Sequence, residues 1–284
     1  MTSRTSPTSP RRRRVLAGLL APAFAPSFAA SPPAAAAADE ILRRVRAHPA
    51  VQDTRCEVVL RLDDPDGGRR ERSLVYLQKR YGADERLTLC FTGPADVRGV
   101  GLQSLNHDES DPRPDEQWIF LPAFRQVRRV AADDKRGAFM GSQFSYADLD
   151  RLRVGDFAQM LQGEERVLGR DCHVIERTAR SDEVVGRTGY LRQRVWVDQE
   201  RSLVLRQAYH DPAGLLFKQL DVTRVERIQD VWTVMESVMV DRASRRSSTL
   251  VFSDVRYDTG LDDALFRQDI LKTGIGRGNL PAIR

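Results

Sequence analysis

Most of this chain alternates apolar and polar residues with a period of two, and this pattern constrains the fold more than any other feature. The alternation begins at Cys56, Val58, Leu60 and Leu62 and continues almost to the end of the chain. A period of two places successive side chains on opposite faces of a β-strand, so each run predicts a strand with one buried face. Turn-forming residues separate the runs about every 10–14 residues, which is typical of an antiparallel meander.

The alternation predicts a mainly β protein with one large sheet. About ten or eleven strands form it, and a strongly twisted sheet of that size curls, so we expect an unclosed half-barrel. Arginine-rich outer faces indicate one wet face and one covered face. Helices laid across the covered face then act as a lid over an apolar cavity, and such cavities hold ligands. The runs lie at 56–62, 72–80, 86–91, 99–106, 116–121, 126–130, 165–168, 172–178, 192–197, 204–210, 216–227, 232–241 and 246–254.

The alternation stops between Phe139 and Gln162, where glycines and acidic helix starts predict a loop with one or two short helices. The segment Asp39–His48 has an apolar stripe and precedes a proline, which predicts a short amphipathic helix. Another short helix is expected at Leu261–Leu271. We expect the Asp39–His48 helix and the region Tyr146–Leu161 to lie across the concave face of the sheet.

Residues 1–38 are predicted to be an export signal that is cleaved, which leaves a single half-barrel domain at residues 39–284. A basic run at Arg11–Arg14 precedes a modestly apolar stretch that prolines interrupt, and small residues follow. Such a stretch is too short and too weakly apolar to span a membrane stably. Cleavage is expected between Ala25 and Ala38, after twin-arginine or Sec export. The mature chain is therefore expected to be soluble and periplasmic.

The net charge of +5 comes entirely from this predicted signal. Five of the 45 basic residues and none of the 40 acidic residues lie in residues 1–38, so the rest of the chain is neutral on balance. Proteins that bind nucleic acid usually carry a basic surface. The composition therefore argues against a nucleic-acid partner.

The sequence contains no pattern typical of an active site or a metal site. Paired aspartates lie in turns or at helix starts, where aspartate bonds to the local backbone. The 4 histidines form no HExxH or HxH pattern, and no GxSxG elbow is present. We therefore expect no catalytic residue, no metal and no cofactor, and a binding protein instead of an enzyme. Cys56, Cys90 and Cys172 permit one disulfide in an oxidising compartment, but three buried thiols are the favoured alternative.

The most distinctive stretch runs from Asp115 to Leu149 and carries aromatic residues on a strand and on the glycine-hinged loop after it. Two interpretations remain open: the loop closes one end of the core, or it exposes an apolar gate beside a lipid-sized cavity. Methionine and phenylalanine on a flexible loop suit an adaptable apolar contact. For the gate, the expected cargo-binding residues are Trp118, Phe120, Phe139, Met140, Phe144 and Tyr146.

Two adjacent arginines in this stretch, Arg128 and Arg129, are expected to point to opposite faces of a strand. One of them would face the cavity and bond to loop carbonyls or to Asp148, because an unpaired inward arginine is too costly. In that arrangement Arg128, Arg129 and Asp148 lock the loop in place. The alternative is that both arginines lie on the wet rim of the barrel.

These segments resemble the outer-membrane lipoprotein-sorting protein family, the LolA-like periplasmic carriers. The resemblance runs in order through Leu87–Leu102, Trp118–Val130, Gly137–Leu149 and Val231–Tyr257. It implies an unclosed antiparallel β-barrel with helices as a lid over a hydrophobic cavity. It also implies carriage of acyl chains, on lipoproteins or free lipids, between membranes, with an inner-membrane exporter of the RND type as a partner. The family brings no cofactor and no catalytic residue.

Two other functions compete with a carrier. An envelope sensor uses a similar half-barrel to detect mislocalised lipoproteins, and such a protein usually has a membrane anchor or a second domain. An enzyme acting on an apolar substrate needs a polar constellation inside the cavity, which the sequence does not indicate.

Overall fold

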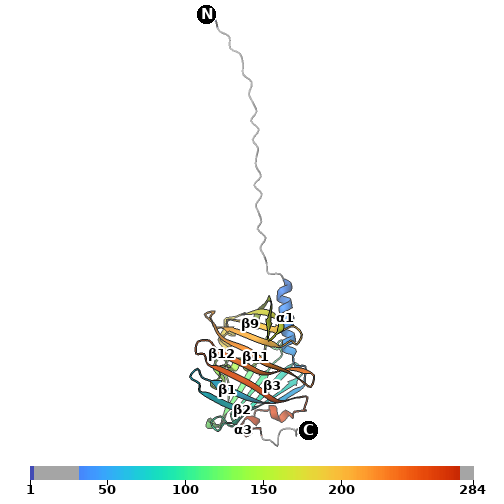
Figure 1. Ribbon diagram of the computed structural model, residues 1–284, viewed down its shortest axis with the longest axis vertical. Helices are drawn as coiled ribbons and strands as arrows, with labels where there is room; N and C mark the ends of the chain where they lie inside the picture. Colours follow the sequence, from blue (N-terminus) through green and yellow to red (C-terminus); the bar gives the residue numbers. More distant parts are fainter. Residues whose placement is uncertain (3–31, 276–284) are drawn as a thin grey trace. The chain divides into compact units, whose positions relative to one another are not determined.

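One antiparallel sheet contains all thirteen strands of the part of the chain that the structure describes. The structure is a computed structural model that describes residues 1–2 and 32–275. Strands β1, β2 and β3 lie side by side in it, as do β11 and β12 (Figure 1). The strands are β1 (Asp53–Asp63), β2 (Arg69–Tyr81), β3 (Asp84–Gly93), β4 (Gly101–Asn106), β5 (Glu116–Leu121), β6 (Gln126–Arg129), β7 (Phe157–Val167), β8 (Arg170–Ala179), β9 (Arg192–Asp198), β10 (Val204–His210), β11 (Leu216–Ile228), β12 (Val231–Asp241) and β13 (Ser247–Tyr257).

The sheet is unclosed, because its edge strands β6 and β7 do not pair with each other. β1 pairs with β13 in the middle, so the two halves of the chain extend from the centre to opposite edges. The prediction of a mainly β, antiparallel half-barrel is confirmed. The sheet has thirteen strands instead of about ten or eleven. Each of the thirteen alternating runs forms one of these strands. β7 begins at Phe157 and not at Glu165, so the expectation that the whole region Tyr146–Leu161 lies across the concave face as a cover is wrong for its last part.

The linker from β6 to β7 starts at one edge of the sheet and ends at the other, and it packs against the inner face on the way. It contains three short 3-10 helices, η2 (Ala132–Asp134), η3 (Phe139–Gly141) and η4 (Tyr146–Leu149). Phe139 and Phe144 are buried in the main apolar cluster with inward side chains of β1 to β4. The linker is therefore part of the core.

Helix α1 (Pro32–Ala47) covers the inner face nearer the β7 edge, beside β9 (Figure 1). Its residues Ile41 and Leu42 are buried in one apolar cluster with Ile175 of β8 and Val195 of β9. The prediction that a helix ending near His48 covers the concave face is confirmed, although the helix begins at Pro32 and not at Asp39.

The outer face of β2 and β3 is covered by the segment that follows β13. The short helices η5 (Asp263–Phe266) and α3 (Ile270–Thr273) replace the single helix expected at Leu261–Leu271. Phe266 is buried in a cluster with Leu77 of β2. Both faces of this part of the sheet are therefore covered, the inner one by the linker and the outer one by the C-terminal segment.

Candidate functional site

A row of polar side chains crosses the inner face of four neighbouring strands. The register pairs Arg177 of β8 with Gln193 of β9, Gln193 with Tyr209 of β10, and Tyr209 with Lys218 of β11. Side chains paired across antiparallel strands share a face and have Cβ atoms about 4.5–5.5 Å apart. The row therefore forms a continuous polar band on a face that is otherwise largely apolar.

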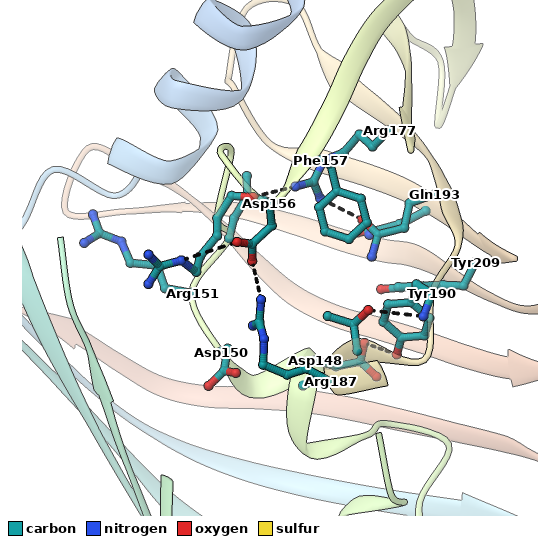
Figure 2. A pocket seen from close by; sticks show the side chains of 15 residues that line it. Asp148, Asp150, Arg151, Asp156, Phe157, Arg177, Arg187, Tyr190, Gln193 and Tyr209 are labelled. Carbon is teal, nitrogen blue, oxygen red and sulfur yellow. Dashed lines mark hydrogen bonds and ion pairs between the residues drawn. The ribbon is translucent and has the colours of Figure 1, made fainter. Parts of the chain in front are cut away.

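Most of this row forms one wall of a pocket of about 160 Å³, which Figure 2 shows from close by. The facing wall comes from the linker, from the start of β7 and from α2 (Asp182–Thr188), a helix that was not predicted from the sequence. The lining residues are Ala147, Asp148, Asp150, Arg151, Leu152, Arg153, Asp156, Phe157, Arg177, Arg187, Thr188, Tyr190, Gln193, Gln207 and Tyr209. We call this cavity the polar pocket.

Lys218 and Asp148 form a buried ion pair that ties the linker to the sheet. Nζ of Lys218 lies 2.6 Å from Oδ2 of Asp148, and each side chain is only 5% exposed. The hydroxyl of Tyr190 donates to the other carboxylate oxygen at 2.7 Å (Figure 2). Ser145 caps η4 by reciprocal hydrogen bonds with Asp148. Burial raises the pKa of Tyr190 well above its ordinary value, so the hydroxyl stays a donor at neutral pH.

Arg177 is almost fully buried at the polar pocket, with 2% of its surface exposed. Its Nη1 donates to Oε1 of Gln193, and its Nη2 donates to the main-chain carbonyl of Arg153, both at 2.7 Å. Its Nε has no hydrogen-bond partner in the described structure. The guanidinium lies 4.4 Å from the ring centroid of Phe157. Burial lowers the pKa of Arg177 to about 10, which leaves the group charged at neutral pH.

A second cavity on the inner face, of about 240 Å³, is mostly apolar, and we call it the apolar hollow. His48 and Pro49, which follow α1, close one side, and a ring nitrogen of His48 lies 2.7 Å from the carbonyl of Trp232. The rings of Tyr76 and Phe252 meet edge to face with centroids 6.5 Å apart. The lining residues are His48, Pro49, Thr54, Cys56, Tyr76, Gln78, Leu203, Trp232, Thr233, Val234, Phe252, Val255 and Tyr257.

Two of the six expected cargo-binding residues lie on the wrong face of the sheet. In the register of β4 and β5, Phe120 is paired with Gly101, and a Cβ on Gly101 would touch Leu271 of α3. Phe120 and Trp118, two positions apart, therefore share the outer face. Trp118 lines a third cavity, of about 260 Å³, together with the C-terminal segment. The prediction that Trp118 and Phe120 line the inner cavity is thus wrong, because the pairing with β4 turns them outward.

The other four residues lie on the inner side but are not exposed as a gate would be. Phe139 and Phe144 are buried in the core, whereas Met140 and Tyr146 are half-buried against the same cluster. The carbonyl of Met140 accepts a hydrogen bond from the guanidinium of Arg72. The loop therefore closes the core at Phe139 and Phe144, and contact of these four residues with cargo stays a prediction.

Arg128 and Arg129 are both exposed on the edge strand β6. Arg129 donates to Glu116 of the neighbouring strand β5 at 3.0 Å. Neither arginine bonds to Asp148, whose basic partner is Lys218. The prediction that one of the two reaches inward to Asp148 is wrong, because β6 has only four residues and lies at the solvent-exposed rim.

The residues of the polar row and Tyr190 were not predicted from the sequence. One signal was present: Arg177 follows Ile175 at a spacing of two, so the alternation places an arginine on the buried face of its strand. The pairing of that position with Gln193 and Tyr209 depends on the register between strands, which the alternation alone does not determine.

Several general features of the described residues bear on function. No three His, Cys, Asp or Glu side chains among them gather in a way that could hold a metal ion. None of the described helices is both long and apolar enough to cross a membrane. Cys56, Cys90 and Cys172 are buried free thiols, which was the favoured alternative.

Solved structures similar to this chain share its LolA-like fold. A DUF1329 family protein from Desulfovibrio piger is 32% identical with a TM-score of 0.78, and the match covers 84% of this chain and 99% of that one. A domain from Vibrio parahaemolyticus described as an outer membrane lipoprotein-sorting protein is 26% identical with a TM-score of 0.76, over 84% and 99%. A LolA superfamily protein from Nitrosomonas europaea, 22% identical with a TM-score of 0.61 over 82% and 98%, shares the fold. A family model described as "uncharacterized protein" matches residues 83–273. No curated protein is similar enough to count as a match.

Proposed function

Because this chain belongs to the DUF1329 family and has a LolA-like fold, we propose that it is a periplasmic carrier of acyl chains. The similar Vibrio parahaemolyticus domain is described as a lipoprotein-sorting protein, and sorting a lipoprotein requires a site that shields its acyl chains from water. The export signal predicted at residues 1–38 supports a location outside the cytoplasm. The cargo is a lipid or a lipoprotein, and an inner-membrane exporter of the RND type is the proposed partner.

The apolar hollow is the observation that carries this proposal. Its walls come from the inner face of β1, β2, β12 and β13, and aromatic rings supply much of its surface. Each buried CH₂ group contributes about 0.8 kcal/mol, so ten groups contribute about 8 kcal/mol before the costs of ordering the chain. Among ligand classes, an acyl chain therefore provides the largest favourable free energy of burial against this apolar surface.

The hollow has to enlarge to hold a whole acyl chain. Ligand cavities usually have volumes of about 300–1,000 Å³, and the apolar hollow has about 240 Å³. The linker packs in the same apolar cluster as Cys56 and Tyr257 of the hollow, and α1 ends just before His48, which lines the hollow. In this proposal they act as the lid, and displacing the lid admits the cargo.

Native mass spectrometry of the full chain, purified gently from periplasm, tests the proposal. Phe252→Asp places a charge in the apolar hollow, and we expect it to abolish the copurification of acyl-chain ligands. The matched control is Phe124→Asp, because Phe124 is 56% exposed and lies outside the hollow. This control should retain the ligand.

A second variant covers the case in which Phe252→Asp does not fold. Phe252→Ala removes ring volume without adding charge, so it should enlarge the hollow and shift the bound species toward longer or bulkier chains. If wild-type protein carries no acyl chain and binds none when it is added, the proposal is refuted. If Phe252→Asp folds and loads as wild type does, the site lies elsewhere.

A further inference from the structure

Every charged side chain that lines the polar pocket has an oppositely charged partner within 4 Å except Arg177. Among the described residues no carboxylate forms an ion pair with the guanidinium of Arg177. The paired groups are Asp148 with Lys218 (2.6 Å), Asp150 with Lys135 (2.8 Å), Arg151 with Glu85 (3.6 Å), Arg153 with Asp115 (2.9 Å) and Arg187 with Asp156 (2.7 Å).

The surroundings of Arg177 orient its guanidinium without neutralising it. Both of its hydrogen-bond acceptors, the side-chain amide of Gln193 and the carbonyl of Arg153, are uncharged. The carboxylate with the strongest influence on Arg177 is that of Asp156, which already accepts a hydrogen bond from Arg187 at 2.7 Å. Figure 2 shows Arg187 pointing at Asp156 while Arg177 lies by Gln193. A buried charge without a partner is costly, so a compensating anion would be bound favourably here.

Further hydrogen-bond donors face the same space. A guanidinium has five N–H donors, and only two of those of Arg177 are accounted for by the bonds to Gln193 and Arg153. The hydroxyl of Tyr209 and the amide of Gln207, both lining the pocket, form no hydrogen bond within the described residues. Burial raises the pKa of Tyr209 well above its ordinary value, so the hydroxyl remains a donor at neutral pH.

We propose that the polar pocket binds the anionic headgroup of the cargo, a carboxylate or a phosphate at the end of an acyl chain, with Arg177 as its counter-ion. The pocket volume of about 160 Å³ accommodates such a group, since a water molecule takes up about 30 Å³ in the liquid. This inference rests on the proposed carrier function and adds to it the chemical class of the cargo.

The position of the pocket fits an amphiphile with one charged end. Tyr190 and Tyr209, which line the polar pocket, belong to the same apolar cluster as Cys56 and Tyr257, which line the apolar hollow. If the headgroup binds at Arg177, the attached acyl chain can therefore pack against that apolar cluster. The planar guanidinium matches the two oxygens of a carboxylate or phosphate, which a lysine ammonium does not.

Binding of three probes with the same oleoyl chain to the full-length protein tests the inference. The probes are oleate, 1-oleoyl lysophosphatidate and uncharged 1-monooleoylglycerol, measured by displacement of a fluorescent fatty acid. The two anionic probes distinguish a carboxylate from a phosphate headgroup. Inorganic phosphate, added as a competitor, shows whether the anion binds without a chain.

Arg177→Met keeps the length of the side chain and removes its charge. We expect the affinity for the better anionic probe to fall about 10- to 100-fold, the usual loss for a charged hydrogen bond, and the affinity for monooleoylglycerol to stay unchanged. Tyr209→Phe, which keeps the ring and removes only the hydroxyl, should weaken the same anionic probe about 5-fold or more. The control Arg128→Met removes an exposed arginine of β6 and should change neither affinity.

Failure of this inference differs from failure of the carrier function. If no probe binds wild type, the carrier function itself is refuted. If wild type binds the neutral and anionic probes equally, or if Arg177→Met weakens all three probes alike, Arg177 only holds the fold and the inference is overturned. Should Arg177→Met fail to fold, an unchanged anion affinity in Tyr209→Phe overturns it instead.

Discussion

The buried ion pair between Lys218 and Asp148 is the interaction that we expect to hold the linker on the sheet most strongly. Lys218→Met removes the ammonium and leaves the carboxylate in place. Removing one partner of a buried pair usually costs about 3–5 kcal/mol, because the other charge stays buried. Asp148 keeps its bonds from the main-chain N–H of Ser145 at 2.7 Å and from the hydroxyl of Tyr190 at 2.7 Å. We therefore expect the lower end of that range, about 3 kcal/mol.

Urea unfolding followed by circular dichroism measures this loss, with Lys218→Met, Asp148→Asn and the double variant compared in one cycle. If Lys218→Met lowers the free energy of unfolding because it leaves the carboxylate of Asp148 unpaired, adding Asp148→Asn should recover part of that loss. Limited proteolysis should also cut Lys218→Met faster within residues 139–149, because the linker is held less firmly.

Two results would refute this account of the linker. One is a free energy of unfolding for Lys218→Met within about 1 kcal/mol of wild type, which is the range of a surface pair. The other is a double variant whose loss equals the sum of the two single losses, because additive effects mean that the two side chains are not coupled.

Three further predictions follow from burial. Burial raises the pKa of the Cys56 thiol to about 12, so only about one molecule in 10⁴ carries the thiolate at pH 8; iodoacetamide should label Cys56 only after denaturation, and rapid labelling of the native protein would contradict this. Ala38 is fully buried within α1, so we now expect the proposed signal to end before Ala38 and not after it; mass spectrometry of the protein from periplasm should place the first residue before Ala38, and a chain starting at Asp39 would contradict this. Phe266→Ala opens a cavity under the C-terminal segment and should cost about 3–5 kcal/mol of unfolding free energy; a loss below about 1 kcal/mol would show that this segment contributes little to stability.

The period-two alternation determined by itself that the chain forms an antiparallel sheet and where most strands lie. The observed bounds of β5 and β10 equal the predicted ones, because each run is flanked by turn-forming residues and its apolar side chains need one buried face. The helix before the first strand was predictable for the same reason, since its apolar stripe has the helical period. These features are local, and local spacing is what a sequence displays.

Tertiary structure alone decided which face is the inside and what meets there. The alternation places Trp118 and Phe120 on one face, but only the pairing of β5 with β4 shows that this is the outer face. Lys218 and Asp148 are 70 residues apart. They meet because the linker crosses from one edge of the sheet to the other. The buried, unpaired charge of Arg177 likewise depends on three strands and the linker packing around it. Contacts of this kind depend on the register between strands and on the path of the linker across the sheet. Neither of these produces a regular spacing of residues in the sequence.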